Sequence, residues 1–288
     1  MDIIYRFDPH AKVEPKHVSS PESAIELLQN GHRRYDEAVT RVQEAVQKGA
    51  GHENTSIVIE ADPLRVGFAR ATGIPAHTPY ALVLGCSDAR VPIERIFDQS
   101  PNDLFVLRVA GNVLGTECLG SIDYAVRNLA DSLALVVVLG HSNCGAVSAA
   151  VDLYLTPQAY PNLGLTHSLR SLVDRIMMAV RGASKAIQQV HGESVMNKPG
   201  FRAAMIEVSV YLNAALTAFD IRREVDLCPV GGIKPDVVYG VFDIVDQTVR
   251  SRPGGGPDEI LGVIADNPDD LEKLGRQFAE VAVAKHLK

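Results

Sequence analysis

The chain has 288 residues, of which 46% are hydrophobic and 22% are charged. This composition is typical of a folded globular protein and excludes a fibrous chain or one that is disordered throughout. The formal net charge is −7, and no run of Lys or Arg forms a basic stripe, so we expect no nucleic-acid partner. The longest apolar runs, Leu133 to Leu139 and Tyr80 to Leu84, are too short to span a bilayer, so we expect no membrane association.

The number of cysteines and the amino-terminal residues indicate the cellular compartment of the protein. Four cysteines in so long a chain do not resemble a disulfide framework, which is typical of short secreted domains. The first six residues lack the apolar core of a signal peptide. We therefore expect a cytoplasmic protein whose cysteines are buried thiols or metal ligands: Cys86, Cys118, Cys144 and Cys228.

The first part of the chain predicts a helical arm. Ser20 and Pro21 place a capping residue and a first-turn proline ahead of apolar residues at helical spacing, which predicts a helix from Pro21 through Val42. The stretch before Pro21 has no clear period, and the segment from Lys48 to Thr78 is punctuated by glycine, as in a connection. Residues 1–78 are therefore predicted to be an N-terminal helical arm and connection.

Short aliphatic runs begin at residue 80. The runs Ala81 to Gly85, Leu104 to Val109 and Leu133 to Gly140 show no polar alternation, which is typical of parallel strands buried on both faces. Between them, Pro92 to Phe97 and Leu119 to Leu129 fit crossover helices. The pattern predicts an α/β fold with a central, mostly parallel sheet flanked by helices.

The rest of the chain is predicted to be mainly helical. A loop rich in Pro and Gly at residues 253–257 precedes the last helix. We interpret residues 79–288 as one α/β domain with C-terminal helices and a helical insertion near 154–200. The expected helices are Ala146 to Leu153, Ser168 to Val190, Arg202 to Ile221 and Asp269 to Leu287, and the expected strands are Leu227 to Val230 and Val237 to Ile244.

Chemically distinctive residues follow two of the predicted strands. Cys86 comes directly after the first, while His141 and Cys144 follow the third. Because ligands bind beyond the carboxyl ends of parallel strands, the three side chains would meet at one point. Zn²⁺ binds Cys sulfur and His nitrogen, and a catalytic site with three protein ligands leaves one position to water. Each residue alone is more often a buried hydrophobe or a surface polar group, but together they predict a catalytic zinc site.

The two segments resemble the two signatures of the β-class carbonic anhydrases. Cys86 to Arg90 is similar to the first signature, and His141 to Gly145 is similar to the second. Arg108 to Asn112 and Gly120 to Ala125 resemble two further family segments in the expected order. The likeness covers most of residues 20–155 and also Val237 to Ile244.

The resemblance implies a zinc enzyme that reversibly hydrates CO₂ to bicarbonate and a proton through zinc-bound hydroxide. It assigns the three zinc ligands to Cys86, His141 and Cys144, and a catalytic pair to Asp88 and Arg90. Arg90 would hold Asp88, which would accept a hydrogen bond from the hydroxide. If the pair opens, Asp88 would become a fourth zinc ligand in a closed state. Since family active sites are built at a subunit interface, a homodimer or higher homo-oligomer is expected.

The substrate pocket is assigned by the same resemblance. It implies that His77, Phe105 and Tyr124 line the pocket and that the backbone N–H of Gly145 lies close to substrate. His77 stands where plant-like members carry Gln, and a neutral imidazole can still donate a hydrogen bond. An aromatic side chain in a strand or helix is otherwise more often a core residue than a pocket residue.

The chain departs from the family at a second, regulatory bicarbonate site. Bicarbonate-inhibited members build that site from Trp, Arg and Tyr. Here Val83 stands at the Trp position and Phe242 near the Tyr position, so that only Arg108 remains. The regulatory site is therefore expected to be absent or altered.

Other functions stay open. A related zinc hydrolase of carbonyl sulfide or carbon disulfide would keep the same ligands. A non-catalytic, zinc-stabilised bicarbonate-binding scaffold is disfavoured by Asp88 and Arg90, because a purely structural zinc site needs no such pair. A nucleotide-binding Rossmann enzyme is the weakest alternative, since no G-x-G-x-x-G follows the first strand. Cys118 and Cys228 match neither signature and are interpreted as structural thiols.

Overall fold

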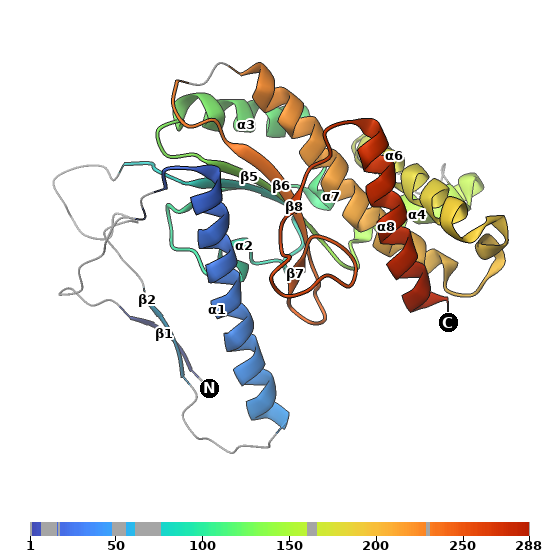
Figure 1. Cartoon of the computed structure of the whole chain (residues 1–288), viewed down its shortest axis with the longest axis horizontal. Coiled ribbons are helices and arrows are strands. Elements are labelled where there is room, and N and C mark those ends of the chain that lie inside the picture. Colours follow the sequence, from blue (N-terminus) through green and yellow to red (C-terminus); the bar gives the residue numbers. More distant parts are fainter. Residues whose placement is uncertain are drawn as a thin grey trace.

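The computed structural model describes residues 2–6, 16, 18–47, 56–60, 76–159, 166–228 and 231–287. Its centre is a six-stranded, mostly parallel sheet in the order β4-β3-β5-β6-β7, with β8 also paired to β6 (Figure 1). The parallel strands are β3 (Ala81–Gly85), β4 (Leu104–Arg108), β5 (Leu135–His141) and β6 (Asp236–Phe242). The short strands β7 (Val249–Arg250) and β8 (Gly262–Val263) run antiparallel to β6. The predicted α/β fold is confirmed.

Helices cover both faces of the sheet. One hydrophobic cluster joins α1 (Pro21–Gln47) and α2 (Ile93–Ile96) to one face. The other face packs against α3 (Thr116–Asn128), α4 (Gly145–Leu155), α6 (His167–His191) and α7 (Phe201–Leu227), and α8 (Pro268–His286) packs on α6 and α7. Three short 3-10 segments are η1 (Ala110–Asn112), η2 (Pro157–Ala159) and η3 (Glu193–Asn197).

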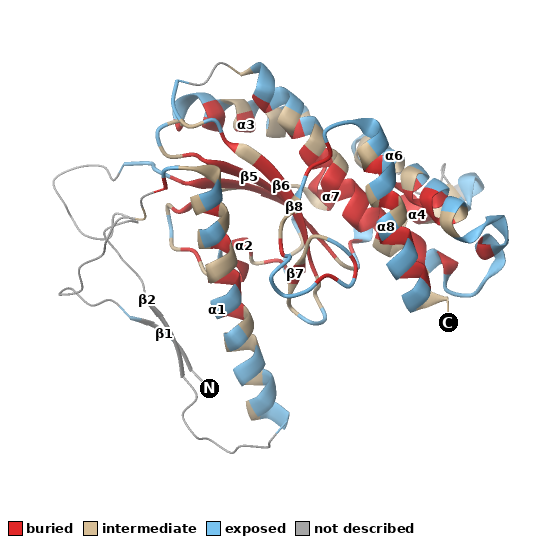
Figure 2. Ribbon diagram, in the orientation of Figure 1, coloured by how far each residue is buried: buried red, intermediate tan, exposed pale blue. Residues whose placement is uncertain are grey.

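The strand predictions succeed because the central strands are buried on both sides. Every residue of β3 and β5 is buried (Figure 2). Successive side chains of a strand point to opposite faces. Accordingly Leu82 and Leu84 belong to the cluster under α3 and α7, while Ala81 and Val83 belong to the cluster under α1. A strand of this kind needs apolar residues at every position, which is the observed pattern.

Helix α1 begins as predicted. The Ser20 Oγ accepts a hydrogen bond from the Ser23 N–H at 3.3 Å, and the Ser23 Oγ accepts one from the Ser20 N–H at 3.2 Å. This reciprocal capping satisfies donors that the first helical turn leaves free. Ala24 and Leu28 are fully buried against the sheet side of the molecule, so the amino-terminal half of α1 is fixed by packing.

Two strands near the amino terminus were not predicted. The strands β1 (Asp2–Arg6) and β2 (Ser56–Glu60) pair in parallel as a separate two-stranded sheet. Both are only five residues long and lie in stretches that show no sustained period. Most of the predicted connection, residues 48–55 and 61–75, lies outside the described residues. The division into residues 1–78 and 79–288 stays a prediction.

The predicted strand at Leu227 to Val230 is wrong where it is described. Leu227 is the last residue of α7, and Cys228 follows it with φ −80° and ψ 126°. The residue before a proline is disfavoured in helical geometry, so Pro229 ends the helix at this point. Residues 229 and 230 lie outside the described residues. An apolar tetrapeptide at a helix end was mistaken for a strand.

Helix α7 forms the centre of the helical layer. Among the described residues it is the one helix that is long and apolar enough to cross a membrane. However, 72% of its most apolar window is buried inside the protein, and Figure 2 shows it buried between the sheet and the neighbouring helices. A core helix of a soluble fold passes the same test, so this finding is weak evidence for a membrane.

Candidate metal centre

The predicted ligands come together at the carboxyl ends of two neighbouring strands. Cys86 follows β3, His141 is the last residue of β5, and Cys144 immediately precedes α4. The strands lie in parallel register, with Gly85 opposite Leu139. The candidate ligand atoms of the three residues lie within 4.8 Å of one another, and all three residues are buried. The sheet thus places two sulfurs and one imidazole at a single point.

Hydrogen bonding of His141 leaves one ring nitrogen free to bind a metal. The His141 Nδ1 lies 2.9 Å from the Ser142 carbonyl oxygen, which can only accept, so Nδ1 carries the proton. Nε2 is buried and has no hydrogen-bond partner among the described residues. A buried polar atom without a partner costs about 1–3 kcal/mol. A metal ion would satisfy Nε2, and two thiolates with one imidazole suit Zn²⁺. The residues present therefore fit zinc.

Local contacts shift the pKa values of the two cysteines in opposite directions. A hydrogen bond between the Cys144 and Cys86 thiols lowers the pKa of Cys86, and the Gly111 backbone N–H, which lies 3.3 Å from the Cys86 Sγ, lowers it further. The same bond and burial raise the pKa of Cys144. These opposite shifts favour the thiolate at Cys86. A thiolate is the form of cysteine that binds metals.

Asp88 and Arg90 form an ion pair beside the ligands. The Arg90 Nε and Nη2 donate to the two carboxylate oxygens of Asp88 at 3.0 and 2.7 Å, and the Arg90 backbone N–H donates at 2.9 Å. These bonds hold the pKa of Asp88 well below its usual range. The Asp88 Oδ2 lies 4.0 Å from the His141 Nε2. An ionised carboxylate is therefore fixed next to the vacant imidazole nitrogen.

Arg108 anchors the loop that carries Cys86 and Asp88. Its Nε donates to the Cys86 carbonyl oxygen at 3.1 Å, and its Nη2 donates to the Asp88 carbonyl oxygen at 2.6 Å. The sequence identified Arg108 only as a remnant of a bicarbonate site. Val83 and Phe242, which stand at the other two positions of that site, are fully buried and offer no surface to an anion.

Comparison with known proteins points to one family. The family model for carbonic anhydrase matches residues 81–219, the segment that contains the three candidate ligands, the Asp88–Arg90 pair and Arg108. This segment, just under half of the chain, is therefore similar to the carbonic anhydrase family. The match spans the strands β3 to β5 and most of α7.

Curated carbonic anhydrases match shorter parts of the chain. A carbonic anhydrase of Mycolicibacterium smegmatis is 41% identical over 120 residues, which cover 41% of this chain and 53% of that protein. Carbonic anhydrase 2 of Mycobacterium tuberculosis is 53% identical over 82 residues, which cover 28% of this chain and 39% of that protein. The chain thus spans about half the length of the first of these relatives and less of the second. Among solved structures, a Coccomyxa β-carbonic anhydrase in complex with acetazolamide is 21% identical with a TM-score of 0.47, covering 74% of this chain and 85% of that one.

Within one chain, the predicted pocket residues His77 and Phe105 lie away from the ligands. The ring of His77 stacks on that of Phe105, with 5.9 Å between centroids. Phe105 stands opposite Leu82 near the start of β3, about 13 Å along the strand from Cys86 at the usual rise per residue. Tyr124 lies on α3 and is 51% exposed. Gly145 does lie at the ligands, as the first residue of α4, with open space where a side chain would be.

Several residues that shape the site were missed from the sequence. The Ser142 carbonyl orients His141, and the Gly111 N–H bonds Cys86. Asn213 on α7 donates from Nδ2 to the Gly111 carbonyl oxygen at 2.8 Å. Backbone groups carry no sequence signal. The one available signal was Asn213 itself, an amide that stands within the mostly apolar run Val208 to Leu216 of α7.

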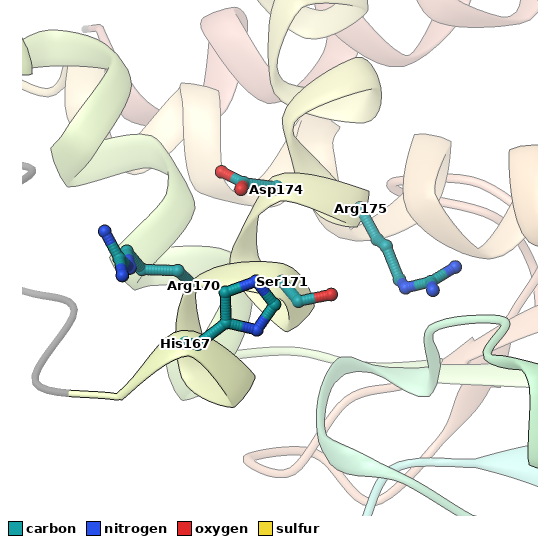
Figure 3. A pocket seen from close by; sticks show the side chains of 5 residues that line it. All are labelled: His167, Arg170, Ser171, Asp174 and Arg175. Atoms are coloured by element: carbon teal, nitrogen blue, oxygen red, sulfur yellow. The ribbon is translucent and has the colours of Figure 1, made fainter.

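A second hollow lies at the start of α6. Its volume is about 510 Å³, and Figure 3 shows the side chains that line it, among which Arg175 extends away from His167 and Arg170. None of the three ligands lines this hollow. The Arg175 Nη1 donates to the Leu114 carbonyl oxygen at 2.7 Å, which ties α6 to the segment after η1. The lining residues are His167, Arg170, Ser171, Asp174 and Arg175.

Proposed function

We propose that this protein is a zinc-dependent carbonic anhydrase that reversibly hydrates CO₂ to bicarbonate and a proton. The observation that carries the proposal is the meeting of Cys86, His141 and Cys144 within 4.8 Å, beside the Asp88–Arg90 pair. A purely structural zinc site has four protein ligands and no need of such a pair. The family match of residues 81–219 supports the same activity.

The protein residues would hold and orient the reactants. Cys86 and Cys144 would supply two sulfur ligands and His141 its Nε2. Bound there, zinc would lower the pKa of a water molecule to about 7 and so make a nucleophile available at neutral pH. Asp88, kept ionised by Arg90, can only accept a hydrogen bond. Its Oδ2 would accept a hydrogen bond from the attacking hydroxyl, which would leave an oxygen lone pair directed at CO₂.

We further propose a homo-oligomer in which a neighbouring subunit completes the pocket. Strand β4 lies at the edge of the sheet, and most of its residues are only partly buried. No strand pairs with its outer side in the part of the chain that the structure describes. The apolar edge, the His77–Phe105 stack and the exposed Tyr124 support a shared interface, because exposed apolar edges are normally covered.

The proposed compartment is the cytoplasm. All four cysteines are free thiols, and thiols persist in reducing compartments. Cys86 and Cys144 would need to stay reduced to bind zinc. This supports a reducing compartment without identifying it further.

Stopped-flow hydration of CO₂ tests the proposed activity. The zinc-loaded protein should hydrate CO₂, lose the activity after removal of zinc by a chelator, and regain it when zinc is restored. Hydrolysis of carbonyl sulfide and carbon disulfide should be assayed in parallel and should be much slower. Absence of CO₂ hydration in protein that contains one zinc per chain would overturn the proposal.

A further inference from the structure

The short segment η1 presents one backbone donor to the metal site. Gly111 has φ +70°, in the left-handed region that favours glycine. In this conformation its N–H donates to the Cys86 Sγ at 3.3 Å, while its carbonyl oxygen accepts from the Asn213 Nδ2 at 2.8 Å. One peptide residue thus joins a buried amide on α7 to a sulfur of the metal site. The chain of contacts runs from Asn213 through Gly111 to Cys86.

The helical layer packs closely around Gly111. A methyl group added to its Cα would lie 2.9 Å from the Ile176 Cδ1 of α6 and 3.1 Å from the Ala146 Cβ of α4. The Arg175 Nη1 of α6 bonds the Leu114 carbonyl oxygen just beyond the turn. Helices α4, α6 and α7 therefore enclose the turn. The predicted insertion near 154–200, which contains α6, contributes to this enclosure.

Asn213 can fix the orientation of the Gly111 backbone, because its buried side chain donates a hydrogen bond to it. It is only 4% exposed, and its neighbours Leu212 and Ala214 are buried apolar residues. An amide in such surroundings is costly unless it is hydrogen-bonded. The bond from Asn213 fixes the orientation of the Gly111 carbonyl. The backbone of Gly111 then directs its own N–H toward the Cys86 Sγ. Packing against Ile176 and Ala146 alone would restrain position but not this direction.

We infer that Asn213 is a positioning residue for the Cys86 thiolate, acting through Gly111. The inference rests on the proposed zinc site. An N–H···S hydrogen bond draws electron density from the sulfur, so Cys86 donates less charge to a metal ion and leaves it a stronger Lewis acid. Partners of metal ligands commonly tune both affinity and electronic character in this way. Asn213 touches neither metal nor substrate, and its effect is on the ligand alone.

Cobalt(II) substitution tests this inference without an activity assay. Asn213→Ala and the similarly sized Asn213→Leu should shift the sulfur-to-cobalt charge-transfer band to longer wavelength, because the sulfur electrons are held less tightly. Cobalt affinity, measured by competition with a chelator, should fall about tenfold, because the loss of a sulfur held in the binding position outweighs its stronger donation. The matched control is Ser209→Ala, one turn earlier on α7, where the buried hydroxyl has no hydrogen-bond partner among the described residues; it should leave both readouts unchanged.

Each outcome of this test is decisive. An unchanged charge-transfer band and affinity in folded Asn213 variants would overturn the positioning role. A wild-type protein that shows no cobalt–sulfur band would instead overturn the proposed metal site. If both variants unfold, cadmium-substituted wild-type protein gives the answer by NMR. Through-hydrogen-bond couplings are expected from cadmium to the Gly111 amide proton and from the Asn213 side-chain nitrogen to the Gly111 carbonyl carbon, and absence of either contradicts the inference.

Discussion

At the scale of single residues, hydrogen bonds from Arg90 hold the Asp88 carboxylate in place. Three donors of Arg90 reach its carboxylate, and its Oδ2 lies 4.0 Å from the His141 Nε2. The low pKa of Asp88 keeps it ionised throughout the neutral range. The proposed role of the residue is therefore that of an acceptor, which an amide cannot reproduce because its NH₂ group donates.

Replacing Asp88 by asparagine should separate catalysis from metal binding. We expect Asp88→Asn to keep its zinc and its fold while kcat for CO₂ hydration falls roughly 100-fold, the low end for loss of a proton-handling group. Metal analysis, circular dichroism and stopped-flow kinetics measure the three properties. The control is Asp123→Asn, which breaks an exposed pair with Arg127 on α3 and should be silent. Unchanged kinetics in Asp88→Asn would remove Asp88 from the mechanism.

Gly111 should tolerate no side chain. In zinc-free protein, Gly111→Ala should lower the free energy of unfolding by about 1–3 kcal/mol, since alanine is strained at φ +70° and its methyl would meet Ile176 at 2.9 Å. Gly120→Ala in α3, where nothing lies within 4 Å, should instead stabilise by roughly 0.5–1 kcal/mol. Urea unfolding measures both. Equal effects of the two substitutions would refute the steric account of the turn.

The sequence predicted the ligands but not their supports, for a physical reason. Cys86, His141 and Cys144 have side chains with characteristic metal chemistry, so their spacing is informative. The groups that orient them are the Ser142 carbonyl and the Gly111 N–H, which every residue type possesses. Only the folded backbone determines which of these groups points at the site.

At the scale of elements, a buried histidine of α1 is hydrogen-bonded to both α2 and β7. His32 is 4% exposed; its Nδ1 lies 3.0 Å from the Ile96 carbonyl oxygen, and its Nε2 accepts from the Val249 N–H at 2.9 Å. Burial lowers the pKa of His32, and Arg250 adds to this, whereas the Ile96 bond, Asp36 and Asp246 act in the opposite direction. Protonation of Nε2 would break the bond to β7.

Stability should therefore decline in mild acid. Because the folded pKa of His32 lies below its unfolded value near 6.5, the unfolded chain binds more protons below that pH, and stability is lost as the pH falls. The free energy of unfolding in urea should drop by up to about 1.4 kcal/mol per pH unit from this residue between pH 6.5 and its folded pKa. His32→Gln, which can make both bonds, should reduce the slope, whereas exposed His191→Gln should not. A slope that is identical in all three proteins would contradict this account.

Helices and strands could be predicted from the sequence where their burial requires a long run or a regular spacing of apolar residues. The strands β3, β4, β5 and β6 and the helices α6, α7 and α8 follow from uninterrupted apolar runs or helical spacing. The pairing of β1 with β2 was missed because the two short strands lie about fifty residues apart in the sequence. Strands of five residues show too short an apolar pattern to predict, and no turn sequence joins them directly. The end of α7 was misjudged because Leu227, 78% exposed, continues an apolar run without facing a core.

At the scale of the whole molecule, a single chain brings the three predicted metal ligands together, whereas His77 and Phe105 of the predicted pocket lie away from them. Phe105 and His77 lie at the opposite end of the strands from Cys86. In the proposed oligomer these residues serve the site of a neighbouring subunit. The sequence gives residue types for such a pocket but no information on which chain supplies them.

Mixing two inactive variants should restore activity if the site is shared. Cys144→Ala removes a metal ligand, and Phe105→Ala removes a pocket side chain. A mixed oligomer pairs the intact ligands of one chain with the intact Phe105 of the other, so activity after mixing and reassembly should exceed the sum of the two separate preparations. Light scattering should record an oligomer throughout. No gain after confirmed subunit exchange would place Phe105 outside a shared pocket.

Zinc-edge X-ray absorption tests the central claim most directly, because it reports the atoms around the metal. Protein loaded with one zinc per chain should show two sulfur neighbours at about 2.3 Å and one imidazole nitrogen at about 2.0–2.1 Å, with a light atom as the fourth neighbour. His141→Ala should lose the imidazole contribution, and Cys118→Ser should change nothing. A shell without sulfur, or with four sulfurs, would contradict the assignment of Cys86, His141 and Cys144 as the metal site.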